Sequence, residues 1–200
     1  MTLYRFNLRV SQEMFTIISC FEVALRNAID RTLNKGLGPD WLRDSVQPGG
    51  IFDTKSTSET YSNIHKEYCA LAAQQKYSHP SLLSSLSFGT WKHMFASPQF
   101  NATGKRLMSV FPQKPQSVRT HIINQRSIYK DLGNINVLRN RIAHHEPICF
   151  NKAKNQIDTT YIRDKYSQIM RLYGWMGIDS GALLYGLDHV MRTCDQIDRI

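Results

Sequence analysis

The side chains that could carry chemistry are concentrated in residues 138–147, which read LRNRIAHHEP. This stretch combines two arginines, one asparagine and two adjacent histidines. Histidine titrates near neutral pH and can take or give a proton, whereas arginine is permanently charged and binds phosphate through a planar fork. With an asparagine to orient either group, these residue types suit metal-free RNA cleavage, in which a ribose 2′-OH attacks the adjacent phosphate.

A helix is predicted to position this stretch. Its apolar residues recur at spacings of three and four, which indicates one buried face: Leu132, Ile135, Leu138 and Ile142. Pro147 disfavours helical geometry at Glu146, so the helix should end there. The polar cluster therefore lies in the last turns, where the electronegative end of the helix dipole favours cationic side chains.

The spacing within those turns separates the candidate groups. Asn140 and His144 are four residues apart and share a face, and the pair formed by Arg141 and His145 lies one step round. Arg139 lies about 140° round the helix axis from His144, so the two side chains do not automatically meet. They can form a common site because arginine is long and the helix is ending, or because a second subunit completes the site. In the alternative reading, both arginines form a solvated face and the histidines cap the last carbonyls.

The string RNRIAHHEP resembles the signature of the Abi-like family of bacterial abortive-infection proteins. That family is similar to the HEPN superfamily, whose ribonuclease motif is R-N-x-x-x-H. Arg139, Asn140 and His144 match this motif position by position. Residues 22–27 (EVALRN) and 86–91 (LSFGTW) resemble two further segments of the family, in the same order along the chain.

This resemblance extends from about Phe15 to the C-terminus and implies an all-helical domain, usually a homodimer whose two motifs face one cleft. It assigns phosphate stabilisation to Arg139, orientation to Asn140 and proton transfer to His144. A dimer would supply a second histidine to protonate the leaving 5′-oxygen. The residues expected to support the motif are His145, Glu146, Arg141, Glu22, Arg26 and Asn27. For Glu22 and Arg26, an ordinary intrahelical ion pair is the alternative.

The charge balance favours a nucleic-acid partner. The 200 residues carry 25 Lys and Arg against 16 Asp and Glu, a formal net charge of +9. A basic surface attracts phosphate backbones or anionic membranes. Without a Lys-rich amphipathic tail or a lipidation signal, we expect RNA as the partner and no membrane. Unless they are only solvated surface, the basic residues expected to contact RNA phosphates are Lys105, Arg106, Lys114, Arg119, Lys152 and Lys154.

No cofactor and no metal is expected. The four cysteines, Cys20, Cys69, Cys149 and Cys194, form no C-x-x-C pair. The seven histidines include no H-E-x-x-H or similar ligand pair. Three of the cysteines lie among apolar neighbours and are expected to be small core residues. Reduced cysteines and the absence of a signal peptide indicate the cytoplasm.

The rest of the chain also follows helical periodicity. A first helix is expected over about residues 12–34, with a buried stripe of Met14, Ile18, Phe21, Leu25 and Ala28. Shorter helices are expected over residues 55–77, 81–86, 103–111, 160–173 and 180–197. Residues 41–54 are expected to form a loop, and no segment alternates like a strand.

Several single residues carry expectations about local structure. Trp91 and Phe95 should lie in the core, and Gly89 should permit a tight turn or close packing. Ser117 should cap a helix that runs through Ile128, with a break near Gly133.

The sequence thus predicts a single all-α domain over residues 1–200, a HEPN-like helical bundle with extra helices. The function it favours is a metal-independent endoribonuclease of antiphage abortive infection, or a toxin, leaving a 2′,3′-cyclic phosphate and a 5′-hydroxyl. One alternative is a module that binds RNA without cutting it, which a cleavage assay would separate. The other is one protein of a toxin–antitoxin pair, neutralised by an antitoxin protein or a small RNA, which a partner gene beside it would support.

Overall fold

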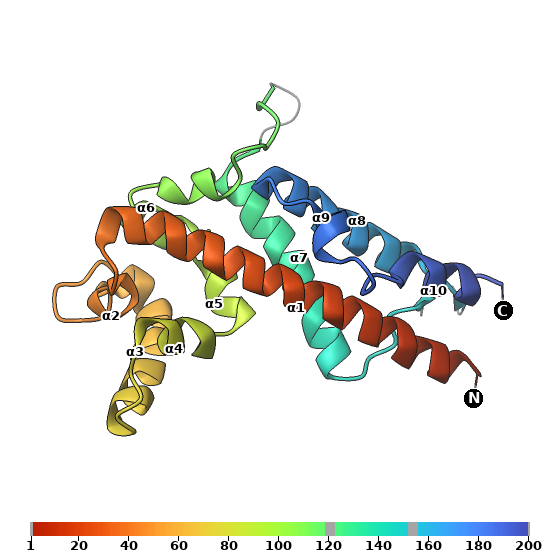
Figure 1. Cartoon of the computed structure of the whole chain (residues 1–200), viewed down its shortest axis with the longest axis horizontal. Helices are drawn as coiled ribbons and strands as arrows, with labels where there is room; N and C mark the ends of the chain where they lie inside the picture. The colour runs from red at the N-terminus through yellow and green to blue at the C-terminus, as the bar shows by residue number, and fades with distance from the viewer. Residues whose placement is uncertain (1, 119–122, 152–155, 200) are drawn as a thin grey trace. The chain divides into compact units, whose positions relative to one another are not determined.

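The computed structural model describes residues 2–118, 123–151 and 156–199. Over these residues the chain consists of α-helices, two short 3₁₀ segments and one small hairpin, which confirms the all-α prediction (Figure 1). The chain divides into two compact units. Unit 1 comprises residues 1–23, 111–115 and 131–200, and unit 2 comprises residues 24–110 and 116–130. One domain over residues 1–200 stays a prediction.

Unit 1 contains the first part of α1 (Thr2–Leu37), the last part of α7 (Gln125–Ala143) and everything after it. The later elements are β1 (Phe150–Asn151), β2 (Gln156–Ile157), α8 (Thr160–Met176), α9 (Ser180–Leu183) and α10 (Val190–Ile197). Each long helix buries an apolar stripe at helical spacing. The buried residues include Met14, Ile17 and Phe21 in α1, Leu132, Ile135 and Leu138 in α7, and Ile162, Ile169 and Leu172 in α8.

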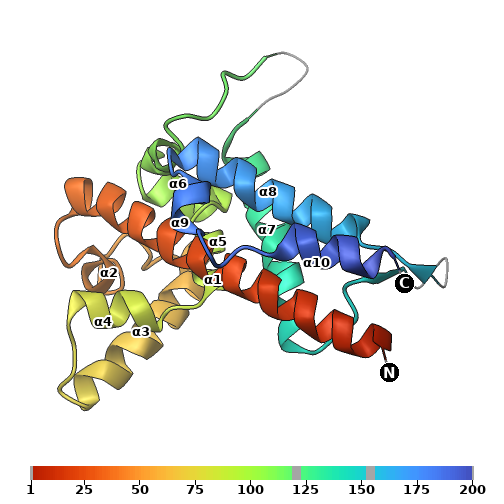
Figure 2. The same ribbon diagram turned by 45° about the vertical axis from the view of Figure 1, so that its right-hand side comes forward.

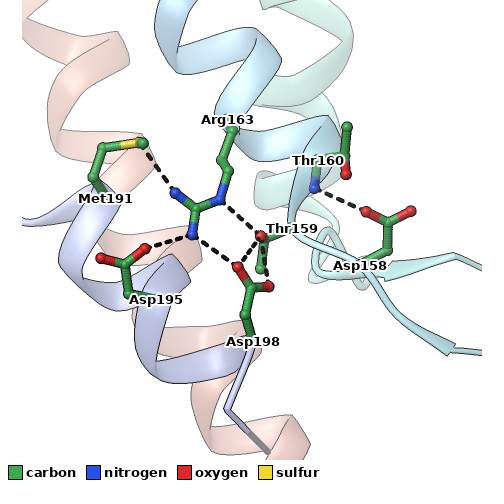
Figure 3. A network of polar contacts seen from close by, with 7 residues as sticks. All are labelled: Asp158, Thr159, Thr160, Arg163, Met191, Asp195 and Asp198. Carbon is green, nitrogen blue, oxygen red and sulfur yellow. Dashed lines mark hydrogen bonds and ion pairs between the residues drawn. The ribbon is translucent and has the colours of Figure 1, made fainter.

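A network of polar contacts connects α10 to α8, and the two helices lie side by side in both views (Figures 1 and 2). Figure 3 shows the Arg163 guanidinium of α8 between two carboxylates of the C-terminal segment. Its Nη2 donates to Asp195 at 2.7 Å and to Asp198 at 2.8 Å, and its Nε donates to Thr159 Oγ1 at 3.0 Å. These hydrogen bonds to carboxylates raise the pKa of Arg163, which keeps it charged. The network is therefore structural, because the Nη2 and Nε groups of Arg163 are already bonded to Asp195, Asp198 and Thr159.

Unit 2 contains the second part of α1 and the short helices that follow. They are α2 (Trp41–Asp44), η1 (Lys55–Thr57), α3 (Ser58–Ala73), α4 (His79–Ser85), α5 (Phe88–His93), α6 (Ser97–Ala102) and η2 (Arg106–Val110), with the first turns of α7. Asp30 of α1 accepts hydrogen bonds from Trp41 Nε1 at 2.8 Å and His79 Nε2 at 2.7 Å. The predicted core residues Trp91 and Phe95 are both fully buried.

Several boundaries differ from the predictions. Helix α1 begins at Thr2, well before residue 12, and ends at Leu37, where Gly38 adopts a φ of +97°. The predicted loop over residues 41–54 contains α2 and buries Trp41 and Phe52, so its apolar residues fold onto the unit instead of lying free. The predicted helix over residues 103–111 is reduced to the 3₁₀ segment η2.

The local predictions for Gly89, Gly133 and Ser117 were wrong. Helix α7 continues through Gly133, since one glycine costs a helix interior only about 1 kcal/mol. Gly89 lies within α5, where a Cβ would make only an ordinary contact with Ser87. Ser117 bonds to the backbone of Ile123 and does not cap α7. The cap is Asn124, whose Oδ1 accepts from the backbone N–H groups of the first turn.

The C-terminal region also departs from its prediction. The single helix expected over residues 180–197 is two helices, α9 and α10, separated by a turn in which Gly186 has a φ of +73°. The antiparallel pair β1–β2, with Phe150 opposite Ile157, was not predicted. Two residues per strand are too few to show alternation in a sequence. Among the described residues, no helix is long and apolar enough to cross a membrane.

Candidate active site

The last turns of α7 carry the predicted motif, and their apolar face anchors them in unit 1. Leu132, Ile135 and Leu138 are fully buried, and Ile142 is 8% exposed, as the spacing predicted. The helix ends at Ala143, three residues before the stop expected from Pro147. The chain therefore leaves the helical path within the motif itself.

The turn that ends α7 is a Schellman motif, in which two backbone hydrogen bonds reach back into the last helical turn. The N–H of His145 donates to the carbonyl of Ile142 at 3.0 Å, and the N–H of Glu146 donates to that of Arg141 at 2.9 Å. His145 occupies the left-handed position of this motif, with a φ of +55°. For a residue with a Cβ this conformation costs about 1 kcal/mol. His145 thus has a role in the backbone of this turn, and the supporting role predicted for it at the motif stays a prediction.

Arg141 holds the same turn through its side chain. Its Nε donates to Glu146 Oε2 at 3.2 Å, and its Nη2 donates to the carbonyl of Pro147 at 2.6 Å. The guanidinium also lies 4.9 Å from the centroid of the Tyr161 ring, a cation–π distance. Arg141 and Glu146 therefore hold the turn that ends α7, and their support of the motif's chemistry stays a prediction.

Asn7, in the first turns of α1, holds the chain beyond the turn. Its Oδ1 accepts a hydrogen bond from the backbone N–H of Ile148 at 2.8 Å, and its Nδ2 donates to the carbonyl of Glu146 at 3.5 Å. Asn7 is only 6% exposed. The sequence analysis missed this residue. The signal was present, because Asn7 lies three and seven residues before the buried Val10 and Met14 and so falls on the buried stripe.

The three residues of the R-N-x-x-x-H pattern are not engaged in this way. Arg139 is half-buried, and Asn140 and His144 are exposed. Within the described ranges, none of these three side chains makes a hydrogen bond, an ion pair or a ring contact. The arrangement thus fixes the turn with Arg141, Glu146 and Asn7 and leaves the motif side chains available to a ligand.

The supporting residues expected from α1 fall in different units. Glu22 belongs to unit 1, whereas Arg26 and Asn27 belong to unit 2. All three are half-buried, and the Nε of Arg26 is buried without a partner among the described residues. Their support of the motif stays a prediction.

The basic residues expected to contact RNA are also distributed over both units. Lys105 and Arg106 are exposed in unit 2, and Lys114 is half-buried in unit 1. The Arg106 guanidinium packs against Gly36 of α1. It lies so close that a Cβ added to Gly36 would be only 2.8 Å from its Nη1. The other three predicted contacts lie outside the described residues: Arg119, Lys152 and Lys154. A shared RNA-binding surface stays a prediction.

The cysteines are all reduced. Cys149 and Cys194 are buried, Cys20 is half-buried and Cys69 is exposed. Burial raises the pKa of the Cys194 thiol to about 11, so this group is unreactive at neutral pH. Over residues 2–118, 123–151 and 156–199, no group of three His, Cys, Asp or Glu side chains is arranged to hold a metal ion.

Comparison with models of known families matches residues 1–149 to the family described as Abi-like protein. The match begins before the resemblance noted in the sequence and ends soon after the Schellman turn, so it contains the whole motif. No curated protein and no solved structure matches the chain significantly.

Proposed function

The chain belongs to the Abi-like family, and from this premise we propose that it is a metal-independent endoribonuclease of the HEPN type. The family supports a role in abortive infection. An RNA-cleaving toxin suits that role, because degrading essential RNA arrests the infected cell. Such an enzyme acts on RNA in the cytoplasm and needs no cofactor.

One observation carries the proposal. In the polar cluster at the end of α7, Arg141 and Glu146 hold the turn, whereas Arg139, Asn140 and His144 make no side-chain contact with other described residues. The unengaged side chains are thus the three of the R-N-x-x-x-H pattern and that of His145, whose backbone is fixed by the turn. Of the two arginines, only Arg139 is left without a partner among the described residues, and it is the arginine of the pattern.

The proposed reaction uses each residue for one task. His144 takes the proton from a ribose 2′-OH, and the 2′-oxygen attacks the adjacent phosphorus. Arg139 neutralises the charge that develops on the phosphate oxygens, and Asn140 orients the reacting groups. The bond to the 5′-oxygen then breaks and that oxygen takes up a proton. The products are a 2′,3′-cyclic phosphate and a 5′-hydroxyl, so no water is consumed in this step.

The leaving oxygen needs an acid while His144 serves as the base. Two-fold pairing of two chains brings two His144 side chains to one phosphate, so one accepts a proton and the other donates one. We therefore propose a homodimer with the ends of both α7 helices facing each other. Light scattering tests this directly, because a fully active monomer at micromolar concentration contradicts it.

The experiment for the function is RNA cleavage in excess EDTA with analysis of the product ends. We expect wild-type protein to yield cyclic phosphates and 5′-hydroxyls, and His144→Ala to yield no products above background. Loss of cleavage on chelation, restored by Mg²⁺ or Mn²⁺, contradicts the metal-free mechanism. Tight RNA binding without any cleavage by the wild type favours the binding module instead.

A further inference from the structure

A hollow lies beside the turn that ends α7. Its volume is about 350 Å³, and its wall is largely apolar. One side is formed by Leu3, Tyr4 and Asn7 of α1, and the other by the residues that follow α7, among them His145, Pro147 and Phe150. Figures 1 and 2 show the first turns of α1 beside this segment. All of these residues belong to unit 1.

The wall presents planar rings. Tyr4 is 63% exposed, and its hydroxyl makes no hydrogen bond to another described residue. His145 is exposed, and Phe150 is half-buried. Flat rings on both sides of one hollow favour a flat ligand that stacks, as unstacked RNA bases do on aromatic and histidine side chains.

The hollow is also preformed. Asn7, which lines the hollow, is buried and forms hydrogen bonds with the backbone of Ile148 and Glu146, so these bonds connect α1 to the turn. The Schellman hydrogen bonds fix the backbone of His145, and Arg141 fixes the carbonyl of Pro147. A site that is already ordered loses less conformational entropy when a ligand binds.

The hollow adjoins the motif in sequence through His145, which lines it. His145 follows His144 directly, so a strand that places a phosphate at His144 has a base close to the hollow. Arg5, the neighbour of Tyr4, is exposed and makes no ion pair within the described part of the chain. It can meet the phosphate of an adjoining nucleotide, and the chain's net charge of +9 favours the same partner.

We propose that this hollow, which we call the base pocket, holds one unstacked base of the RNA strand cut at the motif. The proposal rests on the proposed function and adds which part of the substrate is recognised. A volume of about 350 Å³ is near the lower end of the range of about 300–1,000 Å³ for small-molecule sites, which fits one base better than a larger ligand. The base stacks on Tyr4, His145 or Phe150, and its strand continues to His144.

The test uses His144→Ala protein, so that bound RNA is not cut. A short single-stranded RNA carries one 2-aminopurine, whose fluorescence falls when it stacks on an aromatic ring. The position of the fluorescent base is moved along the strand, and each RNA is compared with its abasic counterpart at that position. We expect one position to be quenched on binding, and its abasic counterpart to bind about 5- to 150-fold more weakly.

Variants of the protein test whether the quenched base lies in the base pocket. Adding Tyr4→Ala should weaken binding of the intact RNA by a similar factor and reduce the quenching. Tyr4→Phe keeps the ring and should leave both unchanged, because the hydroxyl has no partner among the described residues. The matched control is Phe15→Ala, which removes an aromatic ring that is also exposed on α1, at 45%, but does not line the hollow. Circular dichroism checks that each variant is folded.

Equal binding by the Tyr4→Ala and Phe15→Ala proteins, with no position sensitive to base removal, overturns the base pocket. A free mononucleotide that binds as tightly as the strand also overturns it, because the pocket would then serve a soluble nucleotide. The experiments distinguish a failure of the base pocket from a failure of the proposed ribonuclease activity. Cleavage by wild-type protein without base-dependent binding removes only the pocket, whereas base-dependent binding without cleavage removes only the ribonuclease.

Discussion

Helices α7 and α8 end in the same backbone turn, built from different residues. At the end of α8, the N–H of Gly177 donates to Gly174 and that of Ile178 donates to Tyr173, both at 3.0 Å. These are the same two hydrogen bonds that close α7. The left-handed position is filled by Gly177 in α8, with a φ of +74°, and by His145 in α7, with a φ of +55°.

The residues joined by the outer hydrogen bond are apolar at the end of α8 and charged at the end of α7. In α8 the outer hydrogen bond joins Tyr173, which is fully buried, and Ile178, an apolar pair typical of this motif. In α7 the same two positions are Arg141 and Glu146, which form an ion pair. The end of α8 thus combines an unstrained glycine with an apolar pair. The end of α7 accepts a strained histidine and a half-exposed ion pair, and strain of this kind is concentrated at functional sites.

The largest expected effect is on catalysis at the end of α7. His144→Ala should reduce the rate of RNA cleavage about 10²–10⁴-fold, because it removes a positioned acid–base group. The midpoint of urea unfolding should stay unchanged, since the side chain is exposed and has no partner among the described residues. His145→Ala should lose less activity. Loss of activity in His145→Ala with normal cleavage by His144→Ala would reverse the assignment of the two histidines.

The variants of Arg139 and Arg141 should separate an effect on activity from an effect on stability. Arg139→Lys should impair cleavage without lowering the free energy of unfolding, because an ammonium keeps the charge but not the planar fork. Arg141→Met should lower the free energy of unfolding by about 2 kcal/mol, since it removes hydrogen bonds to Glu146 and Pro147 and the contact with Tyr161. Cleavage rates and urea titrations of both variants measure this. Equal stability of the two proteins contradicts the division of roles.

At the end of α8, Gly177→Ala should lower the free energy of unfolding by about 1–2 kcal/mol, because alanine is strained at a positive φ. Its Cβ would also approach Nε2 of Gln113 to 3.1 Å, a contact that the flexible side chain can relieve. Urea unfolding measures the loss, and cleavage per folded molecule should not change. Gly174→Ala, in the same helix and with open space around the added Cβ, is the control.

The smallest expected effect has the opposite sign. His145→Gly should raise the free energy of unfolding by up to about 1 kcal/mol, because glycine adopts the left-handed conformation without strain. The greater freedom of glycine in the unfolded chain offsets part of the gain. A clear loss of stability in this variant would show that the histidine side chain, and not its backbone, holds the turn.

The sequence alone determined the features that depend on local spacing. The buried stripe of Leu132, Ile135 and Leu138 followed from a period of three and four, and so did the all-α class. The residues of the R-N-x-x-x-H pattern were chosen by type and order, and their role stays a prediction. Burial of Trp91 and Phe95 was also predictable, since large aromatic side chains are rarely left in water.

Only the tertiary structure decided which polar residues are used to build the fold. Arg139 and Arg141 are indistinguishable by type, but only Arg141 meets Tyr161, which comes from a helix about twenty residues further along the chain. Asn7 holds the turn from the first helix, well over a hundred residues away in sequence. Such contacts depend on how distant segments pack, and a period within one helix contains no information about them.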